Sequence, residues 1–415
     1  MEGQITLSKK EQKQLAIYPL VREKAITLKE ASEKLGLSYR QAKRNYKKYL
    51  EKGAAGLVHG LRGQPSNHKL PVHYKEAILA FYRNRLQGFN LQHASEKLLE
   101  QKLPVHPETL RLWLKKEGEW TPRRKKVRRH RNWRERKHHL GEMLQLDGSF
   151  HDWLGTGEKY CLMVIVDDAT GITSARLYKE ETTRAAMELL KDWIESHGIP
   201  ESLYTDRKSV YKTDREPTIT EQLNDIQPRT ALGKVCDKLG IQIIFAHSPQ
   251  AKGRVERENG TLQDRFVNEL RYHAIKDIET ANQFLATTFL PNLNRKFRKK
   301  PASEIDGHRK ADNINLDAMF SWEHTRKINN DWTVRFQNQY YQLNGPSAQL
   351  PPAKQRVTVQ KHLDDSIHIL YRGRELSYKA ISKPVAPKKT WRTKTGTPWL
   401  GLGHKPAPTH PWKQP

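Results

Sequence analysis

A very basic stretch limits how this chain can fold. Residues 121–139, TPRRKKVRRHRNWRERKHH, contain ten Lys and Arg residues and a single acid. A segment this charged cannot bury a hydrophobic core. The chain of 415 residues also exceeds the size of one ordinary domain. We therefore predict a multidomain protein in which residues 121–139 are a basic linker between separately folded parts.

The overall charge indicates the kind of partner. Lys and Arg outnumber the acids by 74 to 46, which gives a net charge of +28 and attracts polyanions, nucleic acid above all. We find no apolar run of about 18 residues, and the N-terminus MEGQITLSKK has no secretory pattern. Cys161 and Cys236 alone cannot form a disulfide framework or a Cys-rich zinc site. These features predict a cytoplasmic protein with no membrane partner.

The first 60 residues are predicted to form a helix-turn-helix domain. Thr27 and Glu30 have the spacing of a capping box at a helix start. Gly36 stands where a tight turn is needed, and Ser38 can cap a second helix. In such a unit the second helix enters the major groove of DNA. We expect four basic residues of this helix to contact DNA: Arg40, Lys43, Arg44 and Lys47.

A loose repeat of this unit predicts a second helix-turn-helix-like domain at residues 70–120. The segment Ala-Ser-Glu-Lys-Leu occurs again at 94–98. Pro107 suits the first turn of the following helix, and Leu110 and Leu114 lie on its apolar stripe. Both copies are also compatible with generic helical hairpins that expose basic faces to solvent.

Residues 140–275 alternate between strand-like and helix-like patterns. Three strand-like runs come first, and Gly155 with Gly157 predicts a hairpin between the first two. A helix, a strand, a helix, a strand and a long helix follow. Residues 209–227 are polar and aperiodic, and we interpret them as an insertion. This element order predicts an α/β domain of the RNase H-like type.

The remainder is predicted as three further segments. Residues 276–325 are expected to be helical. Residues 326–382 alternate with short turns, which is typical of a small β-barrel or sandwich. Residues 383–415 are basic and rich in proline, which predicts a tail without a packed core.

Three acids are candidates for a metal-dependent active site. We expect Asp147 to end the first strand and Asp206 the fourth, and these strands are neighbours in an RNase H-like sheet. Glu256 falls in the first turns of the following helix. Such oxygen donors suit two Mg²⁺ or Mn²⁺ ions for phosphoryl transfer. Glu258 is the alternative third ligand, but on a helix it points about 200° away from Glu256.

Other conspicuous residues near these acids have simpler interpretations. Asp167 and Asp168 follow an apolar strand, where turn or structural roles are expected. Trp153 fits a core position better than a wedge that stacks on DNA bases.

Three motifs resemble the catalytic blocks of the retroviral-integrase superfamily. They are QLDGS at 145–149, YTDRKS at 204–209 and SPQAKGRVERENGTLQ at 248–263. With the flanking domains, residues 20–380 are similar to bacterial insertion-sequence transposases of the DDE type, most closely the ISNCY family. Arg207 and Lys208 stand where many relatives have Asn-Gly, and the spacing from Asp206 to Glu256 is longer than usual.

The resemblance implies a transposase that exposes a 3′-OH at transposon ends and joins it to target DNA. Asp147, Asp206 and Glu256 would hold the metals. The protein would bind double-stranded DNA at terminal inverted repeats and target sites, and would act as a homodimer or larger assembly. Apart from the resemblance, Lys252, Asn259 and Gln263 share the helical face of Glu256 and are expected to contact the DNA end, unless this face is ordinary solvated surface.

The basic linker is expected to follow the DNA phosphates, unless it is only a flexible linker. Its expected contacts are Arg123, Arg124, Lys125, Lys126, Arg128 and Arg129.

Two other functions remain open from the sequence. A DNA-binding regulator without catalysis would keep the fold, although three intact acids count against it. An RNase H-like nuclease without strand transfer would not need two sequence-recognition modules. A strand-joining assay separates the two enzymes, and metal-dependent nicking separates both from the regulator.

Overall fold

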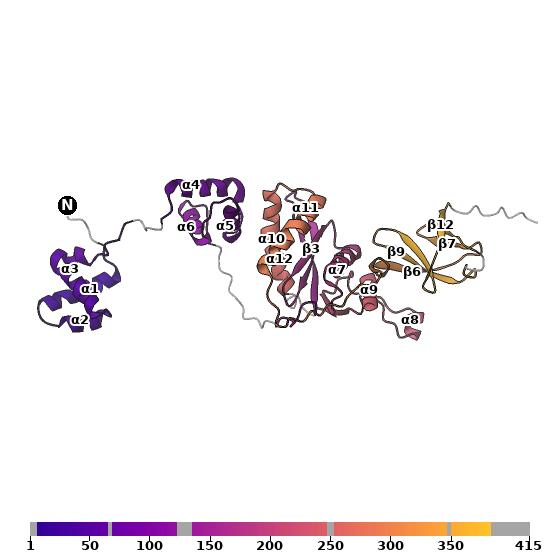
Figure 1. Cartoon of the computed structure of the whole chain (residues 1–415), viewed down its shortest axis with the longest axis horizontal. Helices are drawn as coiled ribbons and strands as arrows, with labels where there is room; N and C mark the ends of the chain where they lie inside the picture. The colour runs from indigo at the N-terminus through magenta and orange to yellow at the C-terminus, as the bar shows by residue number, and fades with distance from the viewer. Residues whose placement is uncertain (1–5, 65–68, 123–134, 247–252, 347–349, 383–415) are drawn as a thin grey trace, which may run out of the picture. The chain divides into compact units, whose positions relative to one another are not determined.

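A computed structural model describes residues 6–64, 69–122, 135–246, 253–346 and 350–382 of the chain (Figure 1). The chain divides into two compact units, Met1–Gln87 with Leu98–Val105, and Gly88–Lys97 with His106–Pro415. The centre of the basic linker and the tail lie outside the described residues.

The first unit begins with helices whose ends are set by local sequence. Its elements are α1 (Lys9–Arg22), α2 (Leu28–Leu35), α3 (Tyr39–Lys52), a 3₁₀ turn (Gly53–Leu57), α4 (Val72–Phe81) and a π turn (Tyr82–Leu86). The predicted capping box is confirmed: Thr27 N donates to Glu30 Oε2 at 2.8 Å, and Glu30 N donates to Thr27 Oγ1 at 3.3 Å. Gly36 adopts φ 64° in the turn, and Ser38 caps α3 through Gln41 N.

Helices α1, α2 and α3 share a small aromatic core. Tyr18 of α1 is fully buried, with its ring centroid 5.6 Å from that of Tyr46 and 5.9 Å from that of Tyr49 on α3. The buried residues Ala31 and Ala42 are small enough to let helices pack closely. This packing fixes α3 with its charged side outward.

Two further helices precede the basic linker. They are α5 (Leu91–Glu100) and α6 (Pro107–Lys116). Pro107 opens α6 behind an N-cap at His106, and Leu110 and Leu114 are fully buried. The local predictions for this helix are confirmed.

The second unit is built on a mixed five-stranded sheet. Its strands are β1 (Leu144–His151), β2 (Tyr160–Asp167), β3 (Thr173–Tyr178), β4 (Ser202–Thr205) and β5 (Gln242–Phe245). The spatial order is β3-β2-β1-β4-β5. Strands β1, β2 and β3 pair antiparallel, whereas β4 is parallel to both β1 and β5. This α/β arrangement fits the predicted RNase H-like core.

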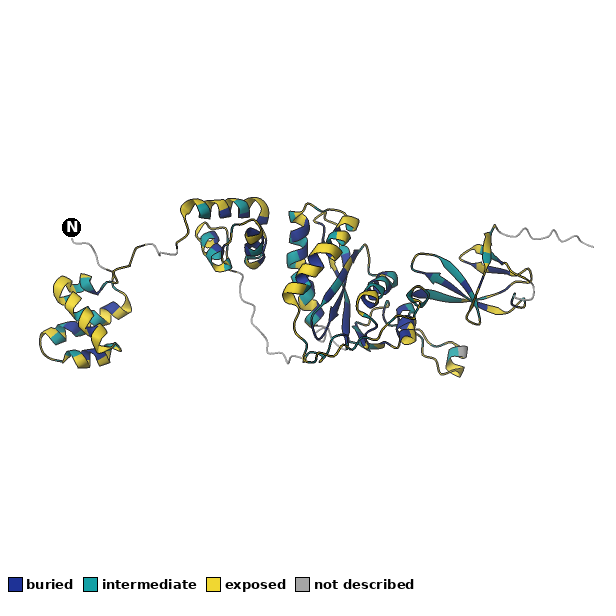
Figure 2. Ribbon diagram, viewed as in Figure 1, coloured by how far each residue is buried: buried dark blue, intermediate teal, exposed yellow. Residues whose placement is uncertain are grey.

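Helices cover both faces of the sheet. They are α7 (Thr183–His197), α9 (Ala231–Leu239), α10 (Gly253–Tyr272), α11 (Ile278–Phe284), a π turn (Leu285–Phe289) and α12 (Leu290–Phe297), with the short α13 (Leu316–Met319) beside α9. Helix α8 (Ile219–Leu223) projects from the sheet (Figure 1) and exposes Ile219 and Leu223. Alternate residues of β2 enter two cores: Met163 packs with α7 and α9, and Val164 packs with α10, α11 and α12. The three layers are visible in Figure 1, and Figure 2 shows the buried strands between them. Within the described residues, no helix is both long and apolar enough to cross a membrane.

One strand boundary differs from the sequence prediction. The expectation that Asp147 ends the first strand is wrong, because β1 continues to His151. Antiparallel pairing with β2 extends from Asp147↔Val164 to His151↔Tyr160 and holds this outer half of the strand. Asp206, in contrast, directly follows the end of β4.

The C-terminal region forms two small sheets around a shared core. Its strands are β6 (Ser321–Lys327), β7 (Thr333–Phe336), β8 (Gln339–Leu343), β9 (Arg356–His362), β10 (Ile367–Tyr371), β11 (Arg374–Leu376) and β12 (Tyr378–Ile381). The orders are β11-β10-β9-β6 and β12-β8-β7. Val334, Val359 and Ile369 lie in the common core.

The prediction of a helical region over residues 276–325 is wrong in its second half. After α12 ends at Phe297, only the short α13 is helical in the described residues up to 325. Strand β6 begins at Ser321, before the expected boundary at residue 326, because it pairs with β9.

Candidate active site

The parallel pairing of β1 with β4 brings two aspartates to one edge of the sheet. Gln145 is in register with Tyr204. Asp147 and Asp206 each stand two residues further along these strands, so they occupy neighbouring positions. The β4 ladder has ended there, and Asp206 instead accepts a hydrogen bond from Lys208 N at 3.1 Å. The predicted strand adjacency is confirmed by this register.

A third carboxylate, not singled out from the sequence, lies beside the two aspartates. Glu181 is in the connection between β3 and α7, and only 6% of its side chain is exposed. Its oxygens contact Lys208 Nζ at 2.7 Å and Tyr211 OH at 3.0 Å. Lys208 Nζ also lies 3.4 Å from Asp206 Oδ2. The ammonium group of Lys208 therefore joins Glu181 to a predicted catalytic aspartate.

The electrostatics of this cluster favour the charged lysine. Burial acts to lower the pKa of Lys208, but its hydrogen bond to Glu181 and the nearby aspartates outweigh burial and raise that pKa. Burial raises the pKa of the Cys161 thiol to about 12, and Glu181 adds to the effect. Cys161 is therefore a protonated core residue at neutral pH and not a nucleophile.

Gly148 makes room for Glu181. A Cβ at this position would lie 2.9 Å from the Glu181 carboxyl carbon and 3.1 Å from Cys161 Sγ. Since Gly148 directly follows Asp147, a side chain here would displace Glu181 from the catalytic strand. The glycine of the QLDGS motif thus has a steric role that its sequence pattern did not indicate.

Helix α10 presents amides to the catalytic strand. Asn259 Nδ2 donates to Asp147 Oδ2 at 3.3 Å, and Gln263 Nε2 donates to Ser149 Oγ at 3.2 Å. Asn259 is 9% exposed. The predicted helical face is therefore the one that meets β1, with both amides on strand residues.

The third predicted ligand, Glu256, does not form a group with the two aspartates in the described residues. Glu256 lies in the first turn of α10, as expected, and is exposed. Glu258 is partly buried, and burial raises its pKa. Across the described residues, no three acidic, histidine or cysteine side chains lie close enough to hold a metal together. The structure brings together Asp147 and Asp206, but it does not complete a triad with either glutamate.

The residues expected to be structural have such contacts. Asp167 is fully buried and accepts hydrogen bonds from Thr170 N at 2.7 Å and Thr170 Oγ1 at 2.6 Å, which makes it a turn former. Trp153 is fully buried, and its Nε1 donates to the Ser149 carbonyl oxygen at 3.1 Å. The predictions of a turn role and a core role are confirmed.

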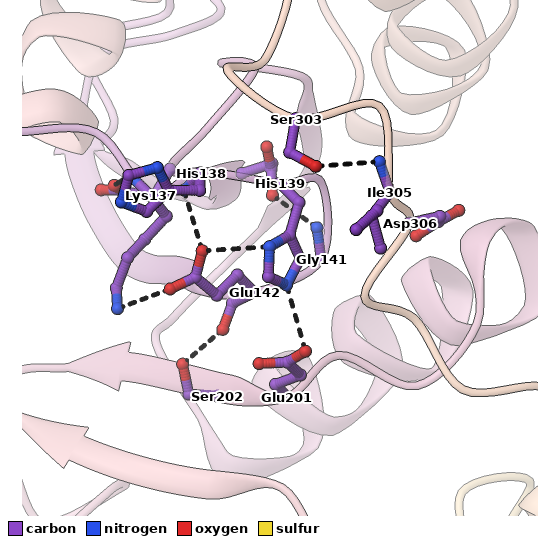
Figure 3. Close-up of polar contacts among 12 residues, drawn as sticks. Lys137, His138, His139, Gly141, Glu142, Glu201, Ser202, Ser303, Ile305 and Asp306 are labelled. Carbon is purple, nitrogen blue, oxygen red and sulfur yellow. Dashed lines mark hydrogen bonds and ion pairs between the residues drawn. The ribbon is translucent and has the colours of Figure 1, made fainter.

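The segment that leads from the basic linker into β1 is fastened to the start of β4 (Figure 3). Glu142 Oε1 pairs with Lys137 Nζ at 2.8 Å, and Glu142 Oε2 accepts from His138 N at 2.8 Å. Ser202 Oγ donates to the Glu142 carbonyl oxygen at 2.7 Å, and His139 Nε2 lies 3.2 Å from Glu201 Oε1. These contacts hold the two aspartate-bearing strands side by side.

The predicted DNA contacts are partly outside the described residues. Arg40, Lys43, Arg44 and Lys47 are all exposed on α3. Lys47 pairs with Glu51 at 3.9 Å, one turn away on the same helix. The other basic candidates, Arg123, Arg124, Lys125, Lys126, Arg128, Arg129 and Lys252, lie outside the described part of the chain.

Comparisons with known proteins identify the family. No family model matches the chain. The chain is 31% identical over 390 residues to "Putative transposase y4bF" of Sinorhizobium fredii, covering 92% of this chain and 83% of that protein. It is 28% identical over 445 residues to the transposase for insertion sequence IS1202 of Streptococcus pneumoniae, covering 97% of this chain and 93% of the relative.

A solved structure is similar at a lower level. It is the simian T-cell lymphotropic virus intasome in complex with PP2A regulatory subunit B56 gamma, which is 18% identical. The match covers 63% of this chain and 85% of that chain with a TM-score of 0.31, too low to support the argument. The similarity to the y4bF relative is sufficient by itself to establish the family. The chain therefore belongs to the transposases, as its DDE motifs predicted.

Proposed function

We propose that Asp147 and Asp206, with Glu256, hold two Mg²⁺ or Mn²⁺ ions at the edge of the sheet. The observation that carries the proposal is the parallel register of β1 and β4, which makes the two aspartates neighbours. Carboxylate oxygens are the donors that these ions prefer. Such ions, when bound, neutralise charge on the reacting phosphate and activate the attacking oxygen.

The reaction consists of two displacements at phosphorus. First, the oxygen of a water molecule bonds to phosphorus at a transposon end, and the P–O3′ bond breaks to leave a 3′-OH. Next, this 3′ oxygen bonds to a phosphorus of target DNA and releases a target 3′-OH. The protein forms no covalent bond to DNA, so its task is positioning and charge neutralisation.

Lys208 and the amides of α10 would orient the site. Lys208 holds its ammonium 3.4 Å from Asp206 Oδ2, where it balances carboxylate charge and is close to a phosphate entering the site. Asn259 would set the orientation of Asp147 through the hydrogen bond from its Nδ2 to Asp147 Oδ2. Lys252 and Gln263 are proposed to contact the DNA end beside the scissile phosphate, together with Asn259.

The identity of the third ligand is open to a direct test. Glu256 matches the glutamate of the resembled motif, and its exposed position in the first turn of α10 lets it move toward a bound cation. Glu258 is the competing ligand. Glu256→Gln should abolish metal-dependent cleavage, whereas Glu258→Gln should preserve it; the reverse result would reassign the ligand.

DNA recognition is proposed to use the N-terminal helices. The capped α2–turn–α3 unit has the form of a helix-turn-helix, and its exposed basic residues on α3 suit the major groove. The basic linker and the C-terminal β-rich region would add phosphate contacts. We propose that a homodimer or larger assembly binds the terminal inverted repeats of an insertion sequence on the bacterial nucleoid.

The DNA-binding proposal is tested by salt dependence. Each phosphate contact contributes about −0.9 to the slope of log affinity against log salt, so six contacts lower affinity by roughly 10³ between 50 and 200 mM salt. Changing Arg40, Lys43, Arg44 and Lys47 to Ala should flatten the slope for end-containing duplexes. The matched control changes Lys9, Lys10, Lys13 and Arg22, four exposed basic residues of α1, and should leave it unaltered.

The decisive experiment is a cleavage and joining assay. Full-length protein is incubated with linear DNA that carries the regions flanking its gene, with Mg²⁺ or Mn²⁺. Nicks at repeat ends and joined products should appear, and should be lost in Asp147→Asn, Asp206→Asn and Glu256→Gln. Binding without cleavage by the unaltered protein would indicate a regulator, and nicking without joining would indicate a nuclease.

A further inference from the structure

A fully buried carboxylate outside the catalytic trio links three functional segments of the second unit. Asp168 directly follows β2 and has no solvent exposure. Its Oδ1 accepts hydrogen bonds from Gln145 Nε2 and Arg254 Nη1, both at 2.6 Å. Its Oδ2 accepts from Lys137 N at 2.8 Å. The reaction described above makes no use of this residue.

Two of these partners belong to the elements that carry the predicted metal ligands. Gln145 is on β1, two residues before Asp147, and Arg254 is on α10, two residues before Glu256. A single carboxylate oxygen therefore contacts both elements.

The amide of Gln145 extends this link to the backbone of the helix. Its Oε1 accepts a hydrogen bond from Val255 N at 3.2 Å, and Val255 is fully buried. The first N–H groups of a helix have no partner within the helix. Gln145 supplies one from a neighbouring strand and thereby fixes where α10 begins relative to Asp147.

The third partner connects this arrangement to the basic linker. Lys137 N donates to Asp168 Oδ2. Lys137 Nζ pairs with Glu142, as Figure 3 shows. Arg136 Nη1 donates to the carbonyl oxygens of Asp168 and Ala169, both at 3.1 Å. The C-terminal end of the linker is thus held by the same turn.

We propose that Asp168 is a positioning residue that sets the first turn of α10, and with it Glu256, relative to Asp147 on β1. The carboxylate acts through Gln145 and Arg254 and touches neither substrate nor metal. Because the geometry around a buried carboxylate is costly to disturb, this contact set holds the turn in one arrangement. The proposal rests on the proposed function, in which Glu256 is a metal ligand.

The test measures Mn²⁺ binding to the full-length protein by calorimetry, beside its thermal unfolding. Asp168→Asn should weaken Mn²⁺ binding by about 10-fold, the scale seen when supporting residues of a metal site are changed. Asp167→Asn is the matched control, since Asp167 is equally buried and lies in the same turn, but accepts from Thr170 and Gly141 instead. It should lower the unfolding temperature and leave Mn²⁺ affinity within about 2-fold.

A double variant separates positioning from a general loss of structure. If Asp168 acts through Glu256, Asp168→Asn should cost little further affinity once Glu256→Gln is present. Additive losses would overturn the proposal, as would equal Mn²⁺ affinities of the Asp168→Asn and Asp167→Asn proteins. If Asp168→Asn does not fold, Arg254→Gln, at a side chain that is 16% exposed, replaces it in the same comparison.

The proposed function has its own control in this experiment. Asp147→Asn should lose Mn²⁺ binding whatever Asp168 does. If the unaltered protein binds no Mn²⁺, or if Asp147→Asn binds it equally well, the proposed metal site is wrong. If Asp147→Asn loses binding and Asp168→Asn keeps it, only the positioning role of Asp168 is wrong.

Discussion

Two pairs of aspartates on the central sheet differ in how their charge is balanced. Asp167 and Asp168 are fully buried, and short hydrogen bonds from backbone and side-chain donors reach both oxygens of each carboxylate. Asp147 and Asp206 lie where β1 and β4 meet at the end of the β4 ladder. Asp206 accepts one backbone hydrogen bond, from Lys208 N at 3.1 Å, and the side-chain contacts of the two aspartates with Asn259 and Lys208 are longer, at 3.3 and 3.4 Å.

The difference indicates which pair is structural and which is available for chemistry. Where a buried carboxylate has short, fixed hydrogen-bond donors, the fold loses stability when any of these donors is removed. A carboxylate with a long contact to a flexible ammonium can exchange that contact for a metal ion at small cost. The spacing of acids in the sequence does not reveal this distinction, whereas burial and donor geometry do.

The largest expected effect is the loss of catalysis when Asp147 or Asp206 is changed. Asp147→Asn or Asp206→Asn should lower strand transfer by at least about 10²- to 10³-fold, the scale for loss of one group that stabilises transition-state charge. The unfolding temperature should stay the same or rise, because a negative charge is removed beside another. Joining assays and thermal unfolding check this prediction, and a large drop in unfolding temperature would assign these aspartates to the structural class.

The next effect is on stability at the buried turn. Asp168→Ala leaves the Arg254 guanidinium without its 2.6 Å partner, and loss of one member of a buried pair costs about 3–5 kcal/mol of unfolding free energy. Urea denaturation measures the change. Asp214→Ala, at a side chain that is 85% exposed, should stay within about 0.5 kcal/mol. If the two substitutions had equal effects, Asp168 would not stabilise the fold, and the contrast between the buried pair and the catalytic pair of aspartates would be lost.

The features that could be predicted from sequence depend on neighbouring residues. Thr27, Glu30 and Gly36 specify a helix start and a turn within ten residues, and all three behave as expected. The order of the strands and of the helices packed on them was predicted in the same way, because each has its own periodicity; the short α8 inside the aperiodic insertion was not predicted. The motifs placed Asp147 on β1 and Asp206 at the end of β4, and these two strands are neighbours.

The features that could not be predicted depend on contacts between distant residues. Strand β1 extends past Asp147 because β2 pairs with it. Glu181 reaches the site from the β3–α7 connection and had no motif of its own, although Lys208 stood within the YTDRKS segment. Asp168 appeared to be only a turn residue, because its link to Gln145 and Arg254 exists only in the folded chain.

A smaller effect is expected at Lys208, which contacts both the buried Glu181 and the more exposed Asp206. Lys208→Met leaves Glu181, with 6% of its side chain exposed, without its 2.7 Å partner, at a cost of about 1–3 kcal/mol of unfolding free energy. Adding Glu181→Gln removes the unpaired charge and should restore most of the stability. Urea denaturation of the two single variants and the double variant measures the coupling. Independent, additive costs would show that the pair does not stabilise the fold.

The smallest expected effect concerns acid sensitivity at Glu142, in the segment that fastens β1 beside β4. Burial acts to raise its pKa, but Lys137 and the backbone N–H of His138 outweigh burial, so the pKa lies below its ordinary value of 4.5. A carboxyl whose folded pKa is lowered stabilises the fold above its unfolded pKa, and this contribution is lost as pH falls through the folded pKa. Glu142→Gln should therefore lower stability near neutral pH, by less than about 1 kcal/mol because the Lys137 partner is partly exposed, and should reduce the further loss on acidification below pH 4.5. Thermal unfolding followed from pH 7 to pH 3 measures both changes. A variant that remains as acid-sensitive as the unaltered protein would contradict this role of Glu142.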